Sequence, residues 1–136
     1  MLLTASSRAD KLWPEGDWLA LAAALNARGL ACVLPGGSAE ERERAARLAK
    51  ADLSRRAAMG IAERRNYWRA RIVVGVDTGL SHIAAALGRL TLCLFSGSRP
   101  ELTGVCAGAT AINIGAAGAP LTADEAIAAT GELLQA

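Results

Sequence analysis

The sequence predicts an α/β domain with a Rossmann-like parallel sheet and helices on both faces. Two mostly apolar runs, Ile72 to Val76 and Leu90 to Phe95, are typical of strands in a buried parallel sheet. Segments with helical spacing of apolar residues alternate with the predicted strands, and short loops join them. Such alternation forms a parallel sheet covered by helices. Because these folds bind ligands at the carboxyl ends of their strands, polar residues there are the site candidates.

The chain begins with a predicted strand and a predicted helix. Leu2 to Ala5 is a short apolar run that predicts a strand, and the polar stretch from Ser6 to Asp10 predicts a loop. Pro14 suits the first turn of a helix, and Gly29 suits its end. Between these two residues, the apolar residues that recur at helical spacing are Trp18, Leu21, Ala22 and Leu25.

A second strand and a second helix are expected next. Leu30 to Leu34 is a continuous apolar run, which predicts a strand buried on both faces and ended by Pro35-Gly36-Gly37. Ser38 and Glu41 have the spacing of a capping box, which predicts the start of a helix. Apolar periodicity is weak in residues 51–70, where we expect a loop and one helix near Ile61 to Arg69.

The C-terminal half continues the alternation. Its predicted strands are Ile72 to Val76, Leu90 to Phe95 and Ala111 to Ile114. An Ala-rich helix that ends at Gly88 is expected after the first of these strands, and a loop from Ser96 to Gly104 after the second. Thr122 and Glu125 repeat the capping-box spacing, which predicts a C-terminal helix.

Size and composition indicate one domain. The chain has 136 residues, and 52% of them are hydrophobic, which is enough to build a core. The formal net charge of +2 is too small to indicate a nucleic-acid partner. Cys32, Cys93 and Cys106 lie far apart and His82 is the only histidine, so no metal site and no metal cofactor are predicted.

Two features bear on location and on the extent of the chain. No apolar stretch approaches the roughly 20 residues of a membrane span, and no signal-peptide pattern is present, so we predict a cytoplasmic protein. Met1-Leu2-Leu3 runs directly into a predicted core strand. A natural domain usually starts with a few loose residues, so we expect the chain to begin partway through a larger architecture.

The most informative segment is Val76-Asp77-Thr78-Gly79-Leu80-Ser81-His82, which leaves a buried strand and opens a helix. The first amides of a helix lack internal partners and carry partial positive charge, so they bind phosphate readily. Gly79 leaves room for a phosphate near the backbone, and the hydroxyls of Thr78 and Ser81 add donors. Asp77, at the tip of the strand, is placed to accept hydrogen bonds from a sugar.

A purely structural interpretation of the same segment stays open. Asp77 or Thr78 would cap the helix, Gly79 would ease the turn, and His82 would face solvent or a core contact. The segment is neither a G-x-G-x-x-G dinucleotide fingerprint nor a G-x-x-x-x-G-K-S/T phosphate loop, so a standard NAD site is not predicted.

Three segments together resemble the lipopolysaccharide heptosyltransferases. Asp77-Thr78-Gly79-Leu80-Ser81-His82 is similar to their D-T-G-L-S-H segment. Ser6 to Pro14 is similar to their T-S/T-R-x-D-K-x-W-P segment, and Leu34 to Arg44 to their L-P-x-G and E-E-x-R segment. The resemblance is closest to the heptosyltransferase I group. It covers nearly the whole chain but only the C-terminal half of the family's enzymes.

The resemblance implies a GT-B architecture, in which two Rossmann-like domains face a cleft. Residues 1–136 would be the donor domain, which binds the nucleotide sugar ADP-L-glycero-D-manno-heptose. The acceptor domain, which binds lipid A–Kdo and carries the catalytic aspartate, would be absent. Heptose is transferred with inversion and without a metal, so no catalytic residue and no cofactor are expected in this chain. The full-length enzyme is expected at the periphery of the inner membrane.

The resemblance also implies roles for single residues. Lys11 would contact the donor phosphates as a point charge, and the hydroxyls and amides of Ser6 and Ser7 would bind phosphate or sugar. Glu41 would accept hydrogen bonds from the ribose, although its capping-box position already explains it. In the remaining segment Asp77 would bind heptose hydroxyls, Thr78 and Gly79 would bind the pyrophosphate, and His82 would lie near the phosphates. Met59 would pack near adenine.

Two departures keep other hypotheses open. Residues 51–70 do not follow the family's pattern, which weakens the expected adenine subsite, and no residues of this sequence are expected to correspond to the acceptor domain. The chain alone is therefore not expected to transfer heptose, because transfer requires both substrates in one geometry. The alternative is a stand-alone or degenerate nucleotide- or phosphate-binding module without transferase activity. An exposed cleft surface would favour homo-oligomers.

Overall fold

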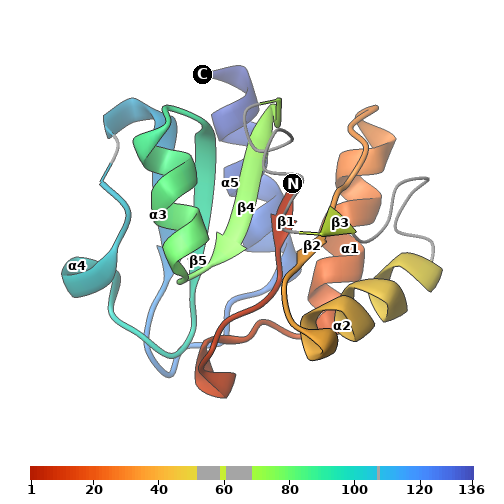
Figure 1. Cartoon of the computed structure of the whole chain (residues 1–136). Coiled ribbons are helices and arrows are strands. Elements are labelled where there is room, and N and C mark those ends of the chain that lie inside the picture. Colours follow the sequence, from red (N-terminus) through yellow and green to blue (C-terminus); the bar gives the residue numbers. More distant parts are fainter. Residues whose placement is uncertain (52–58, 61–68, 107) are drawn as a thin grey trace.

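The computed structural model describes residues 1–51, 59–60, 69–106 and 108–136. A parallel four-stranded sheet lies at its centre, with the strand order β1-β4-β5-β6 (Figure 1). The strands of this sheet are β1 (Leu2–Leu3), β4 (Ile72–Val76), β5 (Leu90–Phe95) and β6 (Ala111–Gly115). A separate two-stranded parallel pair consists of β2 (Pro35–Gly36) and β3 (Met59–Gly60).

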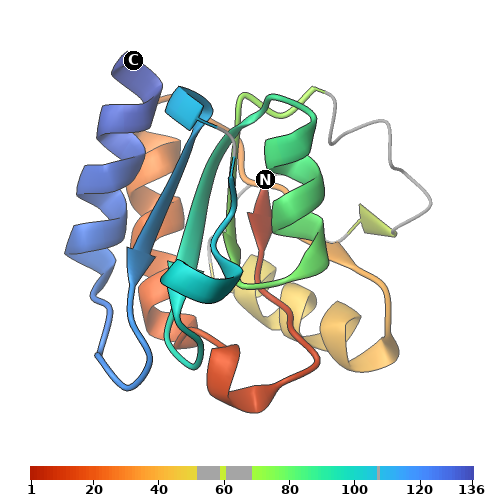
Figure 2. The same ribbon diagram turned by 90° about the vertical axis from the view of Figure 1, so that its left-hand side faces the viewer.

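Helices cover both faces of the main sheet, as the sequence predicts (Figures 1 and 2). α1 and α5 pack together over one face and α3 lies on the other. The helical elements are η1 (Ala9–Lys11), α1 (Glu15–Ala27), α2 (Ala39–Lys50), α3 (Gly79–Ala86), α4 (Pro100–Thr103), η3 (Gly108–Thr110) and α5 (Ala123–Gln135).

The core follows from the alternation of side chains along each strand. Val74 and Val76 of β4 pack in the larger core, which includes buried residues of α1, α2 and α5. Val73 points to the other face, where it packs with Ala84 of α3. Every residue of β4 is buried, which confirms the prediction of a strand covered on both sides.

The predicted helix signals are confirmed at both capping boxes. Ser38 accepts a hydrogen bond from the amide of Glu41, and Thr122 accepts one from the amide of Glu125. In each case the glutamate side chain accepts a hydrogen bond from the backbone amide of the cap residue. These reciprocal bonds satisfy amides that have no partner inside the helix, which fixes where α2 and α5 begin.

The prediction for Leu30 to Leu34 is wrong in two respects. No strand forms over these residues. The nearest strand, β2, begins at Pro35, in the Pro-Gly segment that the sequence predicts as the end of the strand. Burial is also one-sided, since Cys32 and Leu34 are buried whereas Ala31 is exposed. β1 has only two residues to offer as a partner, and a single backbone bond, from the amide of Leu2 to the carbonyl of Val33 (2.8 Å), connects it to this segment.

Other boundaries differ by smaller amounts. β1 ends at Leu3 rather than at Ala5, η1 forms within and just after the predicted loop, and α4 forms inside the predicted loop Ser96 to Gly104. Most of the helix expected near Ile61 to Arg69 lies outside the described residues, as does the side chain of Met59.

Candidate functional site

The loops that follow β1, β4 and β5 meet at the carboxyl edge of the sheet, where the sequence predicts the site. One cavity at this edge, with a volume of about 260 Å³, lies beside the first residues after β1 and β4. Four predicted site residues line it together, namely Ser6, Ser7, Glu41 and Thr78. The other walls come from Leu3, Thr4, Ala5, Pro35 and Leu80.

The N-terminus of α3 borders this cavity and is not closed by a side chain. Thr78 is the cap residue with extended backbone, and its side chain makes no capping hydrogen bond. Within the described part of the chain, the amides of Gly79 and Leu80 meet no hydrogen-bond acceptor. A Cβ at Gly79 would meet no heavy atom within 4 Å, so this glycine faces open space. The helix end is therefore accessible to an anion.

The remaining predicted residues gather around the carboxylate of Asp77, which is 5% exposed. The ammonium of Lys11 donates to Oδ2 of Asp77 over 2.7 Å. Nε2 of His82 lies 3.6 Å from the other carboxylate oxygen, Oδ1. Two further hydroxyls donate to Oδ2, from Ser98 at 2.6 Å and from Thr103 at 3.2 Å. Among the residues that the structure describes, three donors occupy Oδ2, whereas only the imidazole lies beside Oδ1.

These contacts keep Asp77 ionised. Burial alone would raise the pKa of the carboxyl, but the hydrogen bonds from Lys11 and Ser98, the charge of Lys11 and the hydrogen bond from Thr103 outweigh it and hold the pKa below its usual value. The Asp77 charge in turn affects the thiol of Cys93 in β5, whose pKa is raised to about 12 by burial first and then by this carboxylate. An ion pair of Lys11 and Asp77 is therefore present at neutral pH.

Glu41 divides its carboxylate oxygens. Oε2 accepts hydrogen bonds from the amides of Gly37 (2.6 Å) and Ser38 (3.2 Å), which is the capping role. Within the described residues no donor bonds to Oε1, and Glu41 lines the cavity. The capping role and a ligand contact therefore do not compete for the same oxygen.

Sequence reasoning did not identify Ser98 and Thr103 as site residues. Both lie in the segment Ser96 to Gly104, for which the sequence pattern predicts only a loop. One signal was available, because this loop follows the carboxyl end of β5, the strand next to β4. The same edge rule that singled out Asp77 applies to polar residues after the neighbouring strand.

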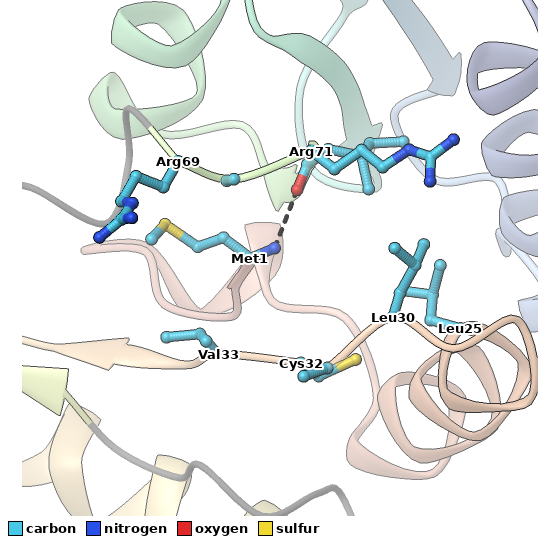
Figure 3. Close-up of a pocket in the computed structure, with 10 residues that line it drawn as sticks. Met1, Leu25, Leu30, Cys32, Val33, Arg69 and Arg71 are labelled. Atoms are coloured by element: carbon cyan, nitrogen blue, oxygen red, sulfur yellow. Dashed lines mark hydrogen bonds between the residues drawn. The ribbon is translucent and has the colours of Figure 1, made fainter.

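A larger cavity of about 440 Å³ lies at the opposite edge of the sheet (Figure 3). Its lining includes Met1 and Ile72 at the amino ends of β1 and β4, together with Leu30, Cys32 and Arg71. The terminal amine of Met1 donates to the carbonyl of Ile72 at 2.8 Å. None of the predicted site residues contributes to this cavity. Although this cavity is the larger of the two, it is therefore not the candidate site.

No group of three or more histidine, cysteine, aspartate or glutamate side chains is placed to hold a metal ion within the described part of the chain. None of the helices that the structure describes has the length and apolar character needed to span a membrane.

The fold and the site together define a Rossmann-like α/β domain whose candidate ligand site lies at the carboxyl edge of a parallel sheet. The chain belongs to glycosyltransferase family 9, the heptosyltransferases, whose sequence profile matches residues 1–124. It is 48% identical over 99 residues to lipopolysaccharide heptosyltransferase 1 of Pseudomonas aeruginosa, a match covering 69% of this chain. It is 39% identical over 109 residues to lipopolysaccharide heptosyltransferase 1 of Escherichia coli, covering 76% of this chain.

Solved structures agree with this family. The Escherichia coli heptosyltransferase WaaC with ADP superimposes with a TM-score of 0.83 over 97% of this chain, at 34% identity. A family 9 glycosyltransferase from Veillonella parvula has the same fold, with a TM-score of 0.84 at 16% identity. The chain spans only part of these proteins: the matches cover 27% and 34% of the two curated relatives and 43% of WaaC.

Proposed function

We propose that this chain is the donor-binding half of a lipopolysaccharide heptosyltransferase and holds ADP-L-glycero-D-manno-heptose. Membership of the heptosyltransferase family supports the sugar, and the structural similarity to a relative solved with ADP supports the nucleotide. The acceptor, the Kdo of the lipid A inner core, would bind to residues outside this chain. The matched relatives, of which the chain spans less than half, are consistent with that division.

One observation carries the proposal, namely the open N-terminus of α3 beside the cavity that holds four predicted ligand residues. The free amides of Gly79 and Leu80 and the hydroxyl of Thr78 supply donors for a diphosphate. Unpaired amides at a helix end and the helix dipole favour the same anion, so no dedicated metal is needed to hold it. Ser6 and Ser7 line the same cavity and supply further donors.

Two charged side chains complete the proposed arrangement. Lys11 uses one of its N–H donors on Asp77 and keeps its positive charge beside the diphosphate site. Oδ1 of Asp77 accepts from no hydroxyl in the described part of the chain, and it is the oxygen that would accept a hydrogen bond from heptose, with His82 next to it. Oε1 of Glu41 would accept from the ribose.

Such a site contributes electrostatics rather than proton transfer. When the bond between heptose and ADP breaks, negative charge builds up on the departing ADP. Preorganised amides together with Lys11 would stabilise this charge. We assign no catalytic base to this chain. Transfer also requires an acceptor held in line with the donor, and that positioning is a large share of the rate enhancement.

The experiment that tests the proposal places a negative charge at the helix end. Gly79→Asp has room for its side chain, and an aspartate in the first turn favours the helix, so the variant is expected to fold. It should nevertheless repel a diphosphate. Isothermal titration calorimetry with ADP is expected to show binding by the natural chain and at least about tenfold weaker binding by Gly79→Asp.

Gly16→Asp is the matched control. Gly16 lies in the first turn of α1 and also has no heavy atom within 4 Å of a built Cβ. This variant should bind ADP like the natural chain. Equal ADP affinity in all three proteins would remove the helix end from the site, and no heat of binding in the natural chain would favour the alternative of a degenerate module.

A further inference from the structure

The loop after β5 contacts both groups that set the position of Lys11. Oγ of Ser96 donates to the carbonyl of Asp10 in η1, at 3.2 Å. Gly97 packs so closely on Asp10 that a Cβ there would lie 2.4 Å from the same carbonyl oxygen. Ser98, the next residue, donates to Asp77, the partner of the Lys11 ammonium. The backbone on one side of Lys11 and the acceptor at its tip are therefore both held by one loop.

The two hydroxyls that reach Asp77 differ in strength. The 2.6 Å distance from Oγ of Ser98 to Oδ2 is in the range of a charge-assisted O–H···O⁻ hydrogen bond. Oγ1 of Thr103 is 3.2 Å from Oδ2 and 3.3 Å from the carbonyl of Arg99. A hydroxyl has one proton, so Thr103 shares it between two acceptors. Ser98 is thus the main hydroxyl partner of the carboxylate.

The geometry points to Ser98 as a positioning residue for donor binding, with Thr103 as its weaker partner. This inference rests on the proposed function, because it gives Lys11 a phosphate to contact. Ser98 fixes Oδ2 of Asp77 and Oδ2 holds the ammonium of Lys11, while Oδ1 lies beside the imidazole of His82. Without the hydroxyl, Oδ2 keeps only the ammonium of Lys11 and the shared hydroxyl of Thr103, so the carboxylate and the ammonium are held less firmly in one direction. Ser98 itself does not line the cavity.

The test compares four variants of the whole chain by ADP titration calorimetry. Ser98→Ala removes the strong hydroxyl, and Ser98→Thr keeps a hydroxyl at the same place. Thr103→Ala removes the shared one. Thr91→Ala is the control, because it removes a buried hydroxyl, which donates to the carbonyl of Arg89, from the opposite end of β5.

We expect about five- to tenfold weaker ADP binding for Ser98→Ala and a smaller loss for Thr103→Ala, since a hydrogen bond to a charged group is worth more than a shared one. Ser98→Thr should restore most of the affinity, and Thr91→Ala should bind like the natural chain. An unchanged affinity in Ser98→Ala, or an equal loss in Thr91→Ala, would overturn the inference.

A second measurement separates this inference from the proposed function. The resonance of the Asp77 side-chain carboxyl carbon, followed by NMR against pH, measures the protonation of this carboxylate directly and without ADP. Loss of the Ser98 hydroxyl should raise the pKa of Asp77, and Ser98→Thr should lower it again. If the natural chain does not bind ADP, the proposed function fails whatever this resonance does. If the natural chain binds ADP, and Ser98→Ala shifts the titration of the Asp77 resonance without changing ADP affinity, only the positioning role fails.

Discussion

The ammonium of Lys11 lies 2.7 Å from Oδ2 of Asp77, although 66 positions separate the two residues in the sequence. Lys11 ends η1, which follows β1, and Asp77 directly follows β4. Because β1 and β4 are parallel neighbours, their carboxyl ends deliver both side chains to the same edge of the sheet. The pair therefore results from the topology of the fold rather than from any local motif.

The first prediction concerns the charge of Lys11. Lys11→Met keeps the length of the side chain but removes the cation, so ADP affinity should fall at least about tenfold. The dependence of affinity on salt concentration should also become shallower, because one fewer charge is screened. Titration calorimetry at two ionic strengths measures both effects.

Lys50 provides the control for this prediction, since the chain has only these two lysines and Lys50 is exposed at the end of α2. Lys50→Met should leave ADP affinity unchanged. An equal loss in both variants would mean that only the overall charge of the protein matters.

The second prediction concerns Asp77 and acid. Its pKa is lower in the folded protein than in the unfolded chain, so the ionised form stabilises the fold above the unfolded value of about 4. That stabilisation is lost as pH falls from there through the folded pKa. Asp77→Asn should lower the free energy of unfolding at pH 7, and the difference between the two proteins should narrow toward pH 3. Urea unfolding at several pH values checks this, and a constant difference would contradict it.

The third prediction separates the two roles of Glu41. Glu41→Gln should keep the capping box, because glutamine also serves at this position, but it removes the negative charge of Oε1. We expect nearly unchanged stability and weaker ADP binding. Ser38→Ala should do the reverse, costing about 1 kcal/mol of stability with little effect on ADP. Thermal unfolding and titration calorimetry on both variants decide this. If Glu41→Gln lost stability but kept its ADP affinity, Glu41 would serve only as a helix cap.

The fourth prediction concerns Gly75 in β4. A Cβ there would lie 2.5 Å from Oγ of Ser81 and 2.9 Å from Cβ of Leu3, both buried in tight packing. Gly75→Ala should therefore cost about 1–3 kcal/mol of stability. Gly16→Ala, in the first turn of α1 with no neighbour within 4 Å, should instead stabilise the protein by about 0.5 kcal/mol. Denaturant midpoints measure both, and a neutral Gly75→Ala would show that β1 and α3 can shift apart.

Those parts of the fold that depend on local signals were predicted well. β4 and β5 have the predicted bounds because each mostly apolar run is flanked by polar residues, Arg71 and Asp77 for β4 and Arg89 and Ser96 for β5. α2 and α5 begin where their capping boxes lie. Leu30 to Leu34 has an equally apolar sequence, yet its pairing depends on the length of β1, which no residue in that segment reveals.

The candidate site was predicted less completely than the fold. The edge rule and the family resemblance led to Asp77, Thr78 and Glu41, which the structure places at one edge of the sheet. The partners of Asp77 in the next loop were missed, because hydrogen bonds from Ser98 and Thr103 span 21 and 26 positions. Contacts between loops depend on loop conformation, for which the sequence offers no periodicity.

The place of β1 in the sheet has a consequence for the order of folding. Pairing Leu2 with Val74 closes a loop of 72 residues, whereas pairing Ile72 with Leu90 closes one of 18. The fourfold longer loop costs about 1.2 kcal/mol more in chain entropy, and β1 returns only two residues of pairing for it. The segment from β4 to α5 should therefore assemble first, and β1, although it precedes that segment in the sequence, should be the last strand of this sheet to reach its native position.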